Sequence, residues 1–193
     1  MNEAESLKQI LNMHALFLKL RQDHWLHYEA FTWQWWSLVF FLFAPWLLWI
    51  KIVNKKKIVE ISLFGILIFV LTTGMDAIGV SYQLWNYPIK LAAKLPHMFS
   101  MDTTVFPITF MIIYQYYPTW HLYLKVTIII SAIFSFIGEP LLEYLKVYNT
   151  TGWKYIYSFP IFILIGAVCK YIVDWLILIQ LKLRNTNNFY CLW

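Results

Sequence analysis

Charged residues are scarce in this chain. Asp, Glu, Lys and Arg together make up 13% of its 193 residues, whereas hydrophobic residues make up 61%. So little polar sequence remains that a separate water-soluble domain is excluded, and the composition predicts one membrane domain covering residues 1–193. The function is therefore expected within or beside the lipid bilayer, which is the first predicted partner.

Cysteine and recognisable catalytic motifs are also lacking. Cys169 lies within a hydrophobic run and Cys191 in the C-terminal tail, so no disulfide is expected between them. The five histidines show no spacing of four residues, which would place two metal ligands on one helix face. No nucleophile elbow, phosphate loop or dinucleotide fingerprint occurs. The sequence thus predicts no metal and no cofactor, and it leans against an enzyme.

Five hydrophobic runs are long enough to cross a bilayer, for which a helix needs about 20 mainly apolar residues. The third run is the shortest and contains Pro107, which a membrane helix tolerates when neighbouring helices cover it. The predicted fold is an all-α bundle of about five transmembrane helices. Their expected ranges are 35–53, 58–82, 102–117, 122–144 and 159–181.

Residues 1–32 precede these runs and do not resemble a cleaved signal peptide, because Glu3 and Glu5 stand where basic residues are expected. At about 100° per residue, polar and apolar side chains fall on different sides of a helix. The segment is therefore predicted to be an amphipathic helix on the membrane surface. The alternative, a sixth span, is less favoured because Lys19, Arg21 and Asp23 would have to be buried in lipid.

Basic residues predict the orientation. Lys51 and residues 55–57 form a lysine cluster between the first two runs, and such clusters favour the cytoplasmic side. Five spans then place the C-terminus in the cytoplasm, although Lys8, Lys19 and Arg21 favour the opposite orientation. The net charge of +5 comes mostly from loop lysines near lipid headgroups, so nucleic acid is not an expected partner.

Carboxylates inside the predicted spans are the candidate site residues, because each costs about 2.5 to 3.5 kcal/mol to insert. In the second run, polar residues recur at helical spacing up to Asp76 and beyond, and in the fourth run they recur through Ser131 and Ser135. Both polar faces reach the outer side, where the third run begins. The predicted ligand or ion site consists of Asp76, Asp102, Glu139 and Glu143, with Lys154 nearby.

The chemistry of this cluster is open among three interpretations. Carboxylates at one depth repel one another, so they either share protons or are neutralised by a cation such as a lysine or metal ion. Otherwise they form hydrogen bonds that hold the helices together. Separately, Lys170 and Asp174 are one helical turn apart, and this spacing predicts a buried ion pair.

Two features surround the predicted cluster. Pro140 cannot donate a backbone hydrogen bond, so it is expected to open or kink the helix beside Glu139. The long loop after the second run, with Trp85 and Tyr87, is expected to fold back over the outer end of the bundle. Aromatic and basic groups would then surround the carboxylates.

Several short motifs between residues 60 and 165 form a moderately specific set. They are Asp76-x-x-Gly79, Leu84-Trp85-x-Tyr87-Pro88, Asp102 with Pro107, Tyr114-Gln115-Tyr116, Glu139-Pro140 and Trp153-Lys154-x-x-Tyr157-Ser158-Phe159-Pro160. This set resembles an uncharacterised family of small multi-pass membrane proteins from spore-forming Gram-positive bacteria. The resemblance implies a bacterial cytoplasmic-membrane location. It brings no activity, substrate or catalytic residue.

Three functional hypotheses follow from the sequence. In the first, the outer carboxylate cluster binds a cation, protons or a lipid headgroup. In the second, the chain is a structural or assembly subunit whose partner is another membrane protein or a further copy of itself. The third, an intramembrane enzyme acting on lipid through a carboxylate of raised pKa, is the weakest because no nucleophile or metal triad accompanies it.

Overall fold

The computed structural model describes residues 2–95 and 99–190, and most of these residues are helical. The elements, with η marking 3-10 or π-helical stretches, are α1 (Glu3–His24), η1 (Trp25–Glu29), α2 (Trp33–Ile52), η2 (Lys55–Lys57), α3 (Ile58–Ser81), β1 (Trp85–Asn86), η3 (Met101–Val105), α4 (Phe106–Tyr116), α5 (Trp120–Ile133), η4 (Phe134–Gly138), α6 (Glu139–Tyr144), β2 (Asn149–Thr150) and α7 (Tyr155–Tyr190). Strands β1 and β2 pair antiparallel, with Trp85 opposite Thr150. The predicted all-α fold is confirmed.

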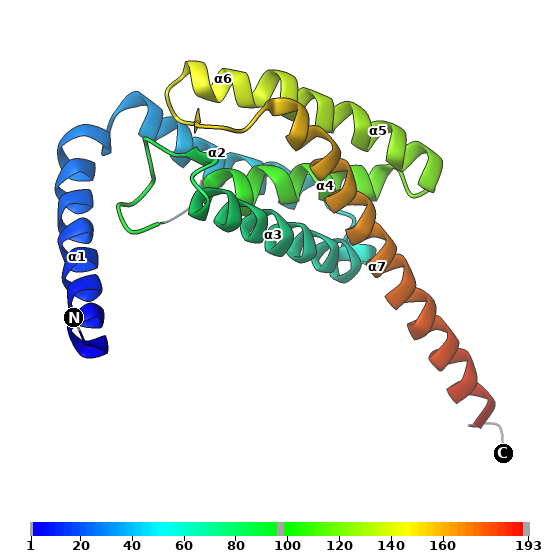
Figure 1. Ribbon diagram of the computed structural model, residues 1–193. Coiled ribbons are helices and arrows are strands. Elements are labelled where there is room, and N and C mark those ends of the chain that lie inside the picture. The colour runs from blue at the N-terminus through cyan, green and yellow to red at the C-terminus, as the bar shows by residue number, and fades with distance from the viewer. Residues whose placement is uncertain (1, 96–98, 191–193) are drawn as a thin grey trace.

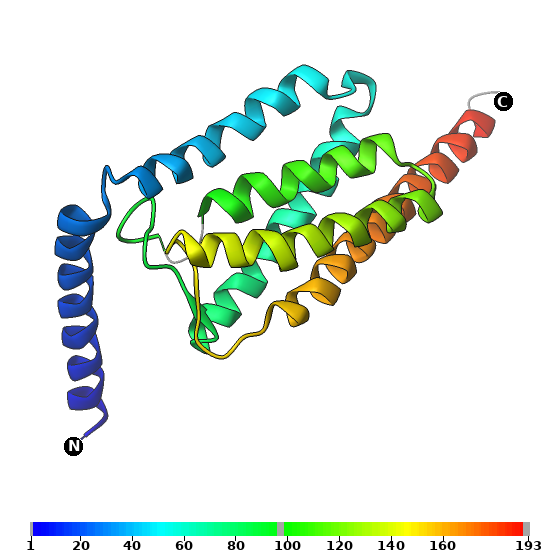
Figure 2. The ribbon, with the colours of Figure 1, turned by 90° about the horizontal axis from the view of Figure 1, so that it is seen from above.

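Helices α2 to α7 form one bundle, in which α4 runs between its neighbours (Figures 1 and 2). The most extensive pairings join α3 with α4, α5 with α7, and α3 with α7. Cys169, a buried free cysteine, lies in the core between these helices, and Cys191 lies outside the described residues. Other buried core side chains are Phe64, Ile68, Phe110, Ile113, Tyr123 and Val173. Many large apolar side chains on the outer faces are exposed, as a lipid environment requires.

Four helical segments are long and apolar enough to span a membrane. They are Trp33–Ile52, Lys55–Ser81, Trp120–Tyr144 and Tyr155–Leu183. The predicted third span, 102–117, is a shorter helical segment made of η3 and α4. Because α4 contacts α2, α3 and α5, its neighbours cover its backbone as the sequence analysis expected. Four of the five predicted spans are therefore long enough to cross a membrane, and the third forms a shorter helix packed among them.

Prolines shape the two helices that carry Asp102 and Glu139. Pro107 and Pro140 each lie at the start of an α-helix, and each is preceded by a π-helical stretch, η3 or η4. A proline has no N–H for the carbonyl four residues earlier, so the preceding turn widens. The backbone N–H of Glu139, for example, bonds to the carbonyl of Phe134, five residues earlier. The opening predicted beside Glu139 is thus a π-helical turn.

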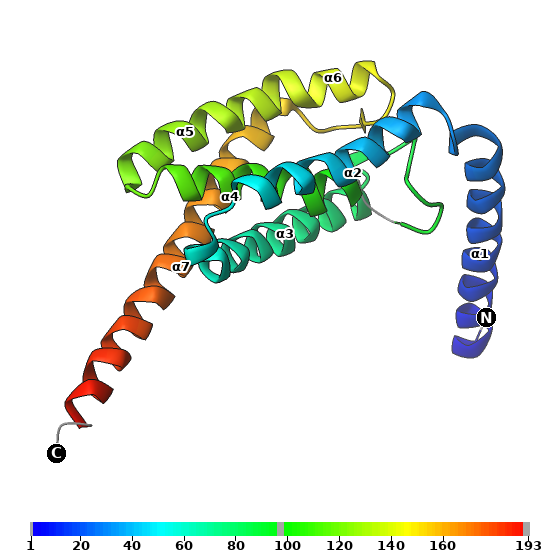
Figure 3. The same ribbon diagram turned by 180° about the vertical axis from the view of Figure 1, so that it is seen from behind.

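Helix α1 leaves the bundle and does not continue along α2 (Figures 1 and 3). Asn2 and Glu5 form a capping box at its start, and none of its residues is buried. Its exposed apolar side chains include Leu7, Ile10 and Phe17. The helix predicted within residues 1–32 is therefore present, as α1 continuing into η1. Its location on a membrane surface stays a prediction.

The bundle has two distinct ends (Figure 2). The loop between α2 and α3 lies at one end, and we name this the lysine end after Lys55, Lys56 and Lys57. The opposite end, where α2 begins and α3 finishes, carries the strand pair and is named the cavity end. The C-terminal part of α7 extends beyond the bundle on the side of the lysine end.

Gly79 is required where the loop after α3 packs against the helix. A Cβ atom at this position would lie 1.9 Å from the Trp85 ring, whereas a Cβ at Gly74 on the same helix would meet nothing within 4 Å. We predict that Gly79→Ala lowers the free energy of unfolding by about 1 to 3 kcal/mol, because the ring must move.

Thermal unfolding in mild detergent measures this effect. Gly74→Ala is the matched control, and it is expected to stabilise by about 0.5 to 1 kcal/mol because helical alanine loses less entropy than glycine. Equal melting temperatures for the two variants would contradict the packing of Trp85 on α3.

Candidate functional site

A cavity of about 270 Å³ lies at the cavity end of the bundle, and we name it the carboxylate cavity. Three carboxylates from three helical segments line it: Asp76 of α3, Asp102 of η3 and Glu139 of α6. The rest of the lining is mainly apolar. It includes the rings of Phe41, Phe106, Phe134 and Phe162. Three of the carboxylates singled out in the sequence thus meet in one mostly apolar space.

Asp76 is held by two donors from the loop after α3. Its Oδ1 accepts a hydrogen bond from Trp85 Nε1 at 2.7 Å and another from the Tyr87 hydroxyl. Burial, reinforced by the nearby Asp76 charge, raises the pKa of Tyr87 well above its ordinary value. The phenol therefore stays protonated and remains a donor. These two bonds fix the loop against the carboxylate cavity, where the sequence analysis expected it.

Asp102 and Glu139 each keep an oxygen without a partner. Asp102 is 7% exposed and lies beside Asp76, and its Oδ2 has no hydrogen-bond partner among the described residues. Glu139 lies beside the hydroxyl of Ser158, whose Oγ accepts from Trp153 Nε1 at 2.8 Å. Glu139 Oε2 is buried and also lacks a partner within the described ranges. Both carboxyl groups can therefore accept a donor or cation from a ligand.

The other two residues of the predicted cluster lie elsewhere. Glu143, one turn after Glu139, accepts hydrogen bonds from the Tyr155 hydroxyl and from Thr150 Oγ1, the latter at 3.3 Å. It therefore joins α6 to β2 and to the start of α7. Lys154, in the loop before α7, is exposed and does not line the carboxylate cavity, although its neighbour Trp153 does. Of the five residues predicted to form one site, Asp76, Asp102 and Glu139 line the carboxylate cavity, and Glu143 and Lys154 do not.

A second cavity, of about 440 Å³, lies at the lysine end and contains Lys170 and Asp174; we name it the lysine cavity. The ion pair that their spacing predicts is present, with Nζ and Oδ2 3.2 Å apart. Three rings surround Nζ, with centroids at 4.8, 5.3 and 5.2 Å: Tyr114, Trp120 and Tyr123. Cation–π contacts and the ion pair together offset the cost of burying the ammonium group.

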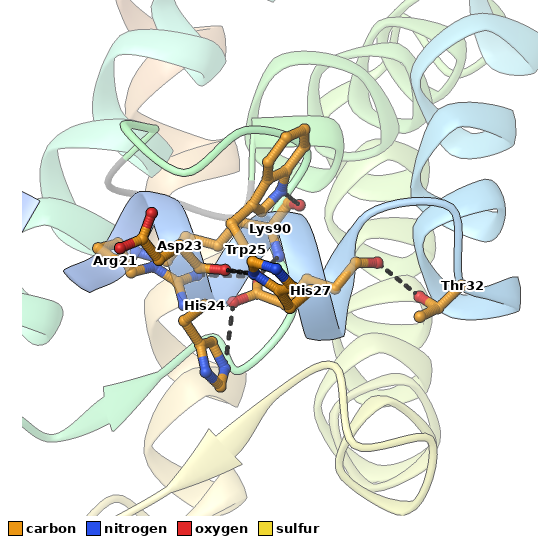
Figure 4. Close-up of polar contacts among 8 residues, drawn as sticks. Arg21, Asp23, His24, Trp25, His27, Thr32 and Lys90 are labelled. Atoms are coloured by element: carbon orange, nitrogen blue, oxygen red, sulfur yellow. Dashed lines mark hydrogen bonds and ion pairs between the residues drawn. The ribbon is translucent and has the colours of Figure 1, made fainter. Parts of the chain in front are cut away.

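Glu29 is a further buried carboxylate, 1% exposed, that the sequence analysis did not single out. It forms a two-point ion pair with Arg21, in which Nη2 and Oε2 are 2.9 Å apart. Its Oε2 also accepts the backbone N–H of Lys90 at 2.9 Å, and Trp25 Nε1 donates to the Lys90 carbonyl at 2.8 Å (Figure 4). We name this set of contacts among Arg21, Trp25, Glu29 and Lys90 the elbow. It fastens the end of α1 to the loop that covers the carboxylate cavity.

Within the described parts of the chain, no group of three or more His, Cys, Asp or Glu side chains could hold one metal ion. Asp76, Asp102 and Glu139 therefore line one cavity without converging on a single point. Asp76 and Asp102 lie within hydrogen-bonding reach of each other, and Glu139 lines the same cavity.

Comparison with models of known families, with curated proteins and with solved structures finds no match for this chain. The resemblance to small bacterial membrane proteins therefore stays a prediction. Function has to be inferred from the geometry of the two cavities and of the elbow at Glu29.

The elbow gives a testable prediction. Glu29→Gln preserves the side-chain shape but removes the charge that Arg21 pairs with, so we expect a loss of about 3 kcal/mol in stability. Amide hydrogen exchange is expected to rise in α1 and in the loop around Lys90.

Glu5→Gln serves as the control, because Glu5 is exposed and only completes the capping box of α1. It is expected to alter exchange in the first turn of α1 alone. Unchanged exchange around Lys90 in the Glu29→Gln variant would show that the elbow does not hold the loop.

Proposed function

We propose that this chain binds a lipophilic organic cation, such as an alkylammonium compound, in the carboxylate cavity. The observation that carries the proposal is that carboxylates from three helical segments line one mainly apolar cavity of about 270 Å³. Carboxylates are costly to bury among apolar walls, so packing alone does not account for a cavity that combines the two. A ligand with a positive head and an apolar body satisfies both.

Charge balance supports a cation as the ligand. Asp76 receives two hydrogen bonds at Oδ1, from Trp85 and Tyr87. Asp102 and Glu139 each have a buried oxygen without a hydrogen-bond partner among the described side chains. Neighbouring carboxylates in a medium of low dielectric repel one another strongly, and a bound cation offsets that repulsion. Asp102 and Glu139 are therefore proposed as the residues that contact the positive head.

The walls of the cavity support an organic cation over a small hydrated ion. The lining includes four phenylalanine rings, and the indoles of Trp85 and Trp153 lie on the side of the loops. Aromatic faces attract organic cations and do not replace the water ligands that a small metal ion requires. The apolar part of the ligand would pack against the phenylalanines, and its head would face the carboxylates.

The proposal places the chain in a bacterial cytoplasmic membrane, with the lysine end and the C-terminus in the cytoplasm. The lysine cluster between α2 and α3 favours this orientation. The carboxylate cavity would then face the outer half of the bilayer, where amphiphilic cations partition from the medium.

A second candidate is a structural subunit of a membrane complex. It is favoured by Asp76 and Glu143, whose hydrogen bonds join helices to loops and so act as structural links. The partner would be another membrane protein or a second copy of this chain. Under this proposal, substitutions in the carboxylate cavity change stability but no ligand response.

The test is ligand-dependent stabilisation of the purified protein in a maltoside detergent. Hexyltrimethylammonium is the cationic probe, and hexanol is its uncharged counterpart. We predict that the cation raises the melting temperature by several degrees at saturation, because a ligand at 100 times its Kd stabilises the folded state by about 2.7 kcal/mol. Asp102→Asn and Glu139→Gln are each expected to weaken binding at least tenfold.

Glu143→Gln is the matched control, since Glu143 belongs to the same short helix as Glu139 but lies outside the cavity. It is expected to keep the full cation response even where its own melting temperature falls. If wild type responds equally to hexanol and to hexyltrimethylammonium, the cation site is wrong. A lower melting temperature in all three variants, with no cation response in any protein, would favour the structural subunit.

A further inference from the structure

A row of polar side chains connects the two cavities along one face of α5, η4 and α6. Tyr123, Thr127, Ser131, Ser135 and Glu139 follow one another at intervals of four residues. The first four are fully buried, each with 0% exposure. The row begins beside the lysine cavity, because the Tyr123 ring lies 5.2 Å from Lys170 Nζ, and it ends at Glu139 in the carboxylate cavity.

Two hydroxyls in the middle of this row, those of Ser131 and Ser135, have no hydrogen-bond partner within the described part of the chain. The Thr127 hydroxyl lies beside the hydroxyl of Tyr123, the first residue of the row, and has no other partner there. Several hydroxyls elsewhere in the bundle bond to their own helix. Thr72 donates to the Ile68 carbonyl at 3.0 Å, and Ser81 donates to the Ala77 carbonyl at 2.7 Å. A buried hydroxyl without a partner costs about 1 to 3 kcal/mol. Two such hydroxyls in succession on one face, next to Thr127 and Tyr123, mark this row as a place where water would be bound.

Titratable groups stand at both ends of the row. At the lysine end, Lys170 faces Asp174 on its own helix, and the Tyr114 hydroxyl of α4 donates to Glu60 of α3 at 2.7 Å. Lys57 also lines this cavity. At the other end, Glu139 faces a separate group of polar side chains. They are Asp76 of α3, Asp102 of η3, Tyr148 in the loop after α6 and Ser158 of α7.

We propose that this row is a proton path from the lysine cavity to Glu139. A hydroxyl group accepts a proton on its oxygen and donates its own to the next acceptor, so it passes a proton on without a net change. Side chains four residues apart on a helix have Cβ atoms about 5 to 6 Å apart, so a water molecule bridges successive hydroxyls. One water beside each of these hydroxyls would also satisfy their hydrogen-bonding capacity.

A hydronium ion in the lysine cavity gives up its proton and becomes water, and the Glu139 carboxylate gains an O–H bond at the far end. The carboxyl group becomes neutral and holds a bound cation less strongly. This last step rests on the proposed function, whereas the path itself does not. Proton entry at the lysine end would thus discharge the cation from the carboxylate cavity.

Proton flux into proteoliposomes tests the path. The full chain is reconstituted into phosphatidylcholine and phosphatidylglycerol vesicles that contain a pH-sensitive dye, and valinomycin with a potassium gradient sets the membrane potential. Wild type is expected to acidify the lumen at least tenfold faster than protein-free vesicles. Ser131→Ala is expected to lower the flux at least tenfold, because it removes the central hydroxyl.

Two controls separate a path from a structural role. Ser131→Ala removes a buried hydroxyl without a partner, so its melting temperature is expected to equal or exceed that of wild type. Thr73→Ala removes another buried hydroxyl without a partner among the described residues, but on α3 and outside the row, and is expected to keep the wild-type flux. Thr127→Val, which keeps the side-chain shape, is expected to lose flux as Ser131→Ala does.

The outcomes divide clearly. No flux above protein-free vesicles, or equal flux in wild type and Ser131→Ala, would overturn the path. Equal losses of flux in Ser131→Ala and Thr73→Ala would also overturn it, because the row would then have no special role. If the flux depends on Ser131 but hexyltrimethylammonium does not stabilise the protein, the proton path is supported and the proposed cation site is wrong.

Discussion

The hydrogen bonds that Trp85 and Tyr87 donate to Asp76 hold the cavity end of the bundle together. Burial removes the indole and the phenol from water, so these donors need an acceptor inside the protein. Once both rings are fixed, β1 is placed to pair with β2, and Trp153 packs edge-on against Trp85 with ring centroids 5.0 Å apart. Gly79 provides the space for this arrangement. The cover of the carboxylate cavity thus depends on one carboxylate of α3.

The other two carboxylates owe their positions to proline. Pro107 and Pro140 are each preceded by a π-helical stretch, and Asp102 and Glu139 lie within or directly after these stretches. A π-helical turn changes which side of the helix the following residues face, and it is a common feature of functional sites. Two helices that differ in direction and sequence therefore use the same backbone device to turn a carboxylate toward the cavity. This repetition explains how acidic side chains on separate helices meet.

Much of the fold can be predicted from the sequence. Which residues line the carboxylate cavity can be predicted only in part. The hydrophobic runs predict the bundle helices, and helical spacing predicts the pair of Lys170 and Asp174. Spacing also suggested Glu143. It cannot show that Glu143, one turn after Glu139, lies outside the cavity and contacts β2 instead. Glu29 was missed because its burial depends on the loop around Lys90, which is remote in sequence. Its separation of eight residues from Arg21 gave no signal, because residues eight apart lie about 12 Å apart along a regular α-helix.

The contact between α5 and α7 shows why the buried hydroxyl row is not simply interhelical packing. Tyr123 donates to the carbonyl of Gly166 at 2.9 Å, and a Cβ atom at Gly166 would lie 3.2 Å from the Tyr123 hydroxyl oxygen and 2.7 Å from the ring of Phe110. A small residue and one cross-helix hydrogen bond therefore already provide the close approach that membrane helices need. Hydroxyl groups that glue helices together bond across the interface, and Thr127 and Ser131 make no such bond within the described structure. Because the helix contact is made without them, bound water would offset the cost of burying these hydroxyls, and the proposed proton path uses that same water.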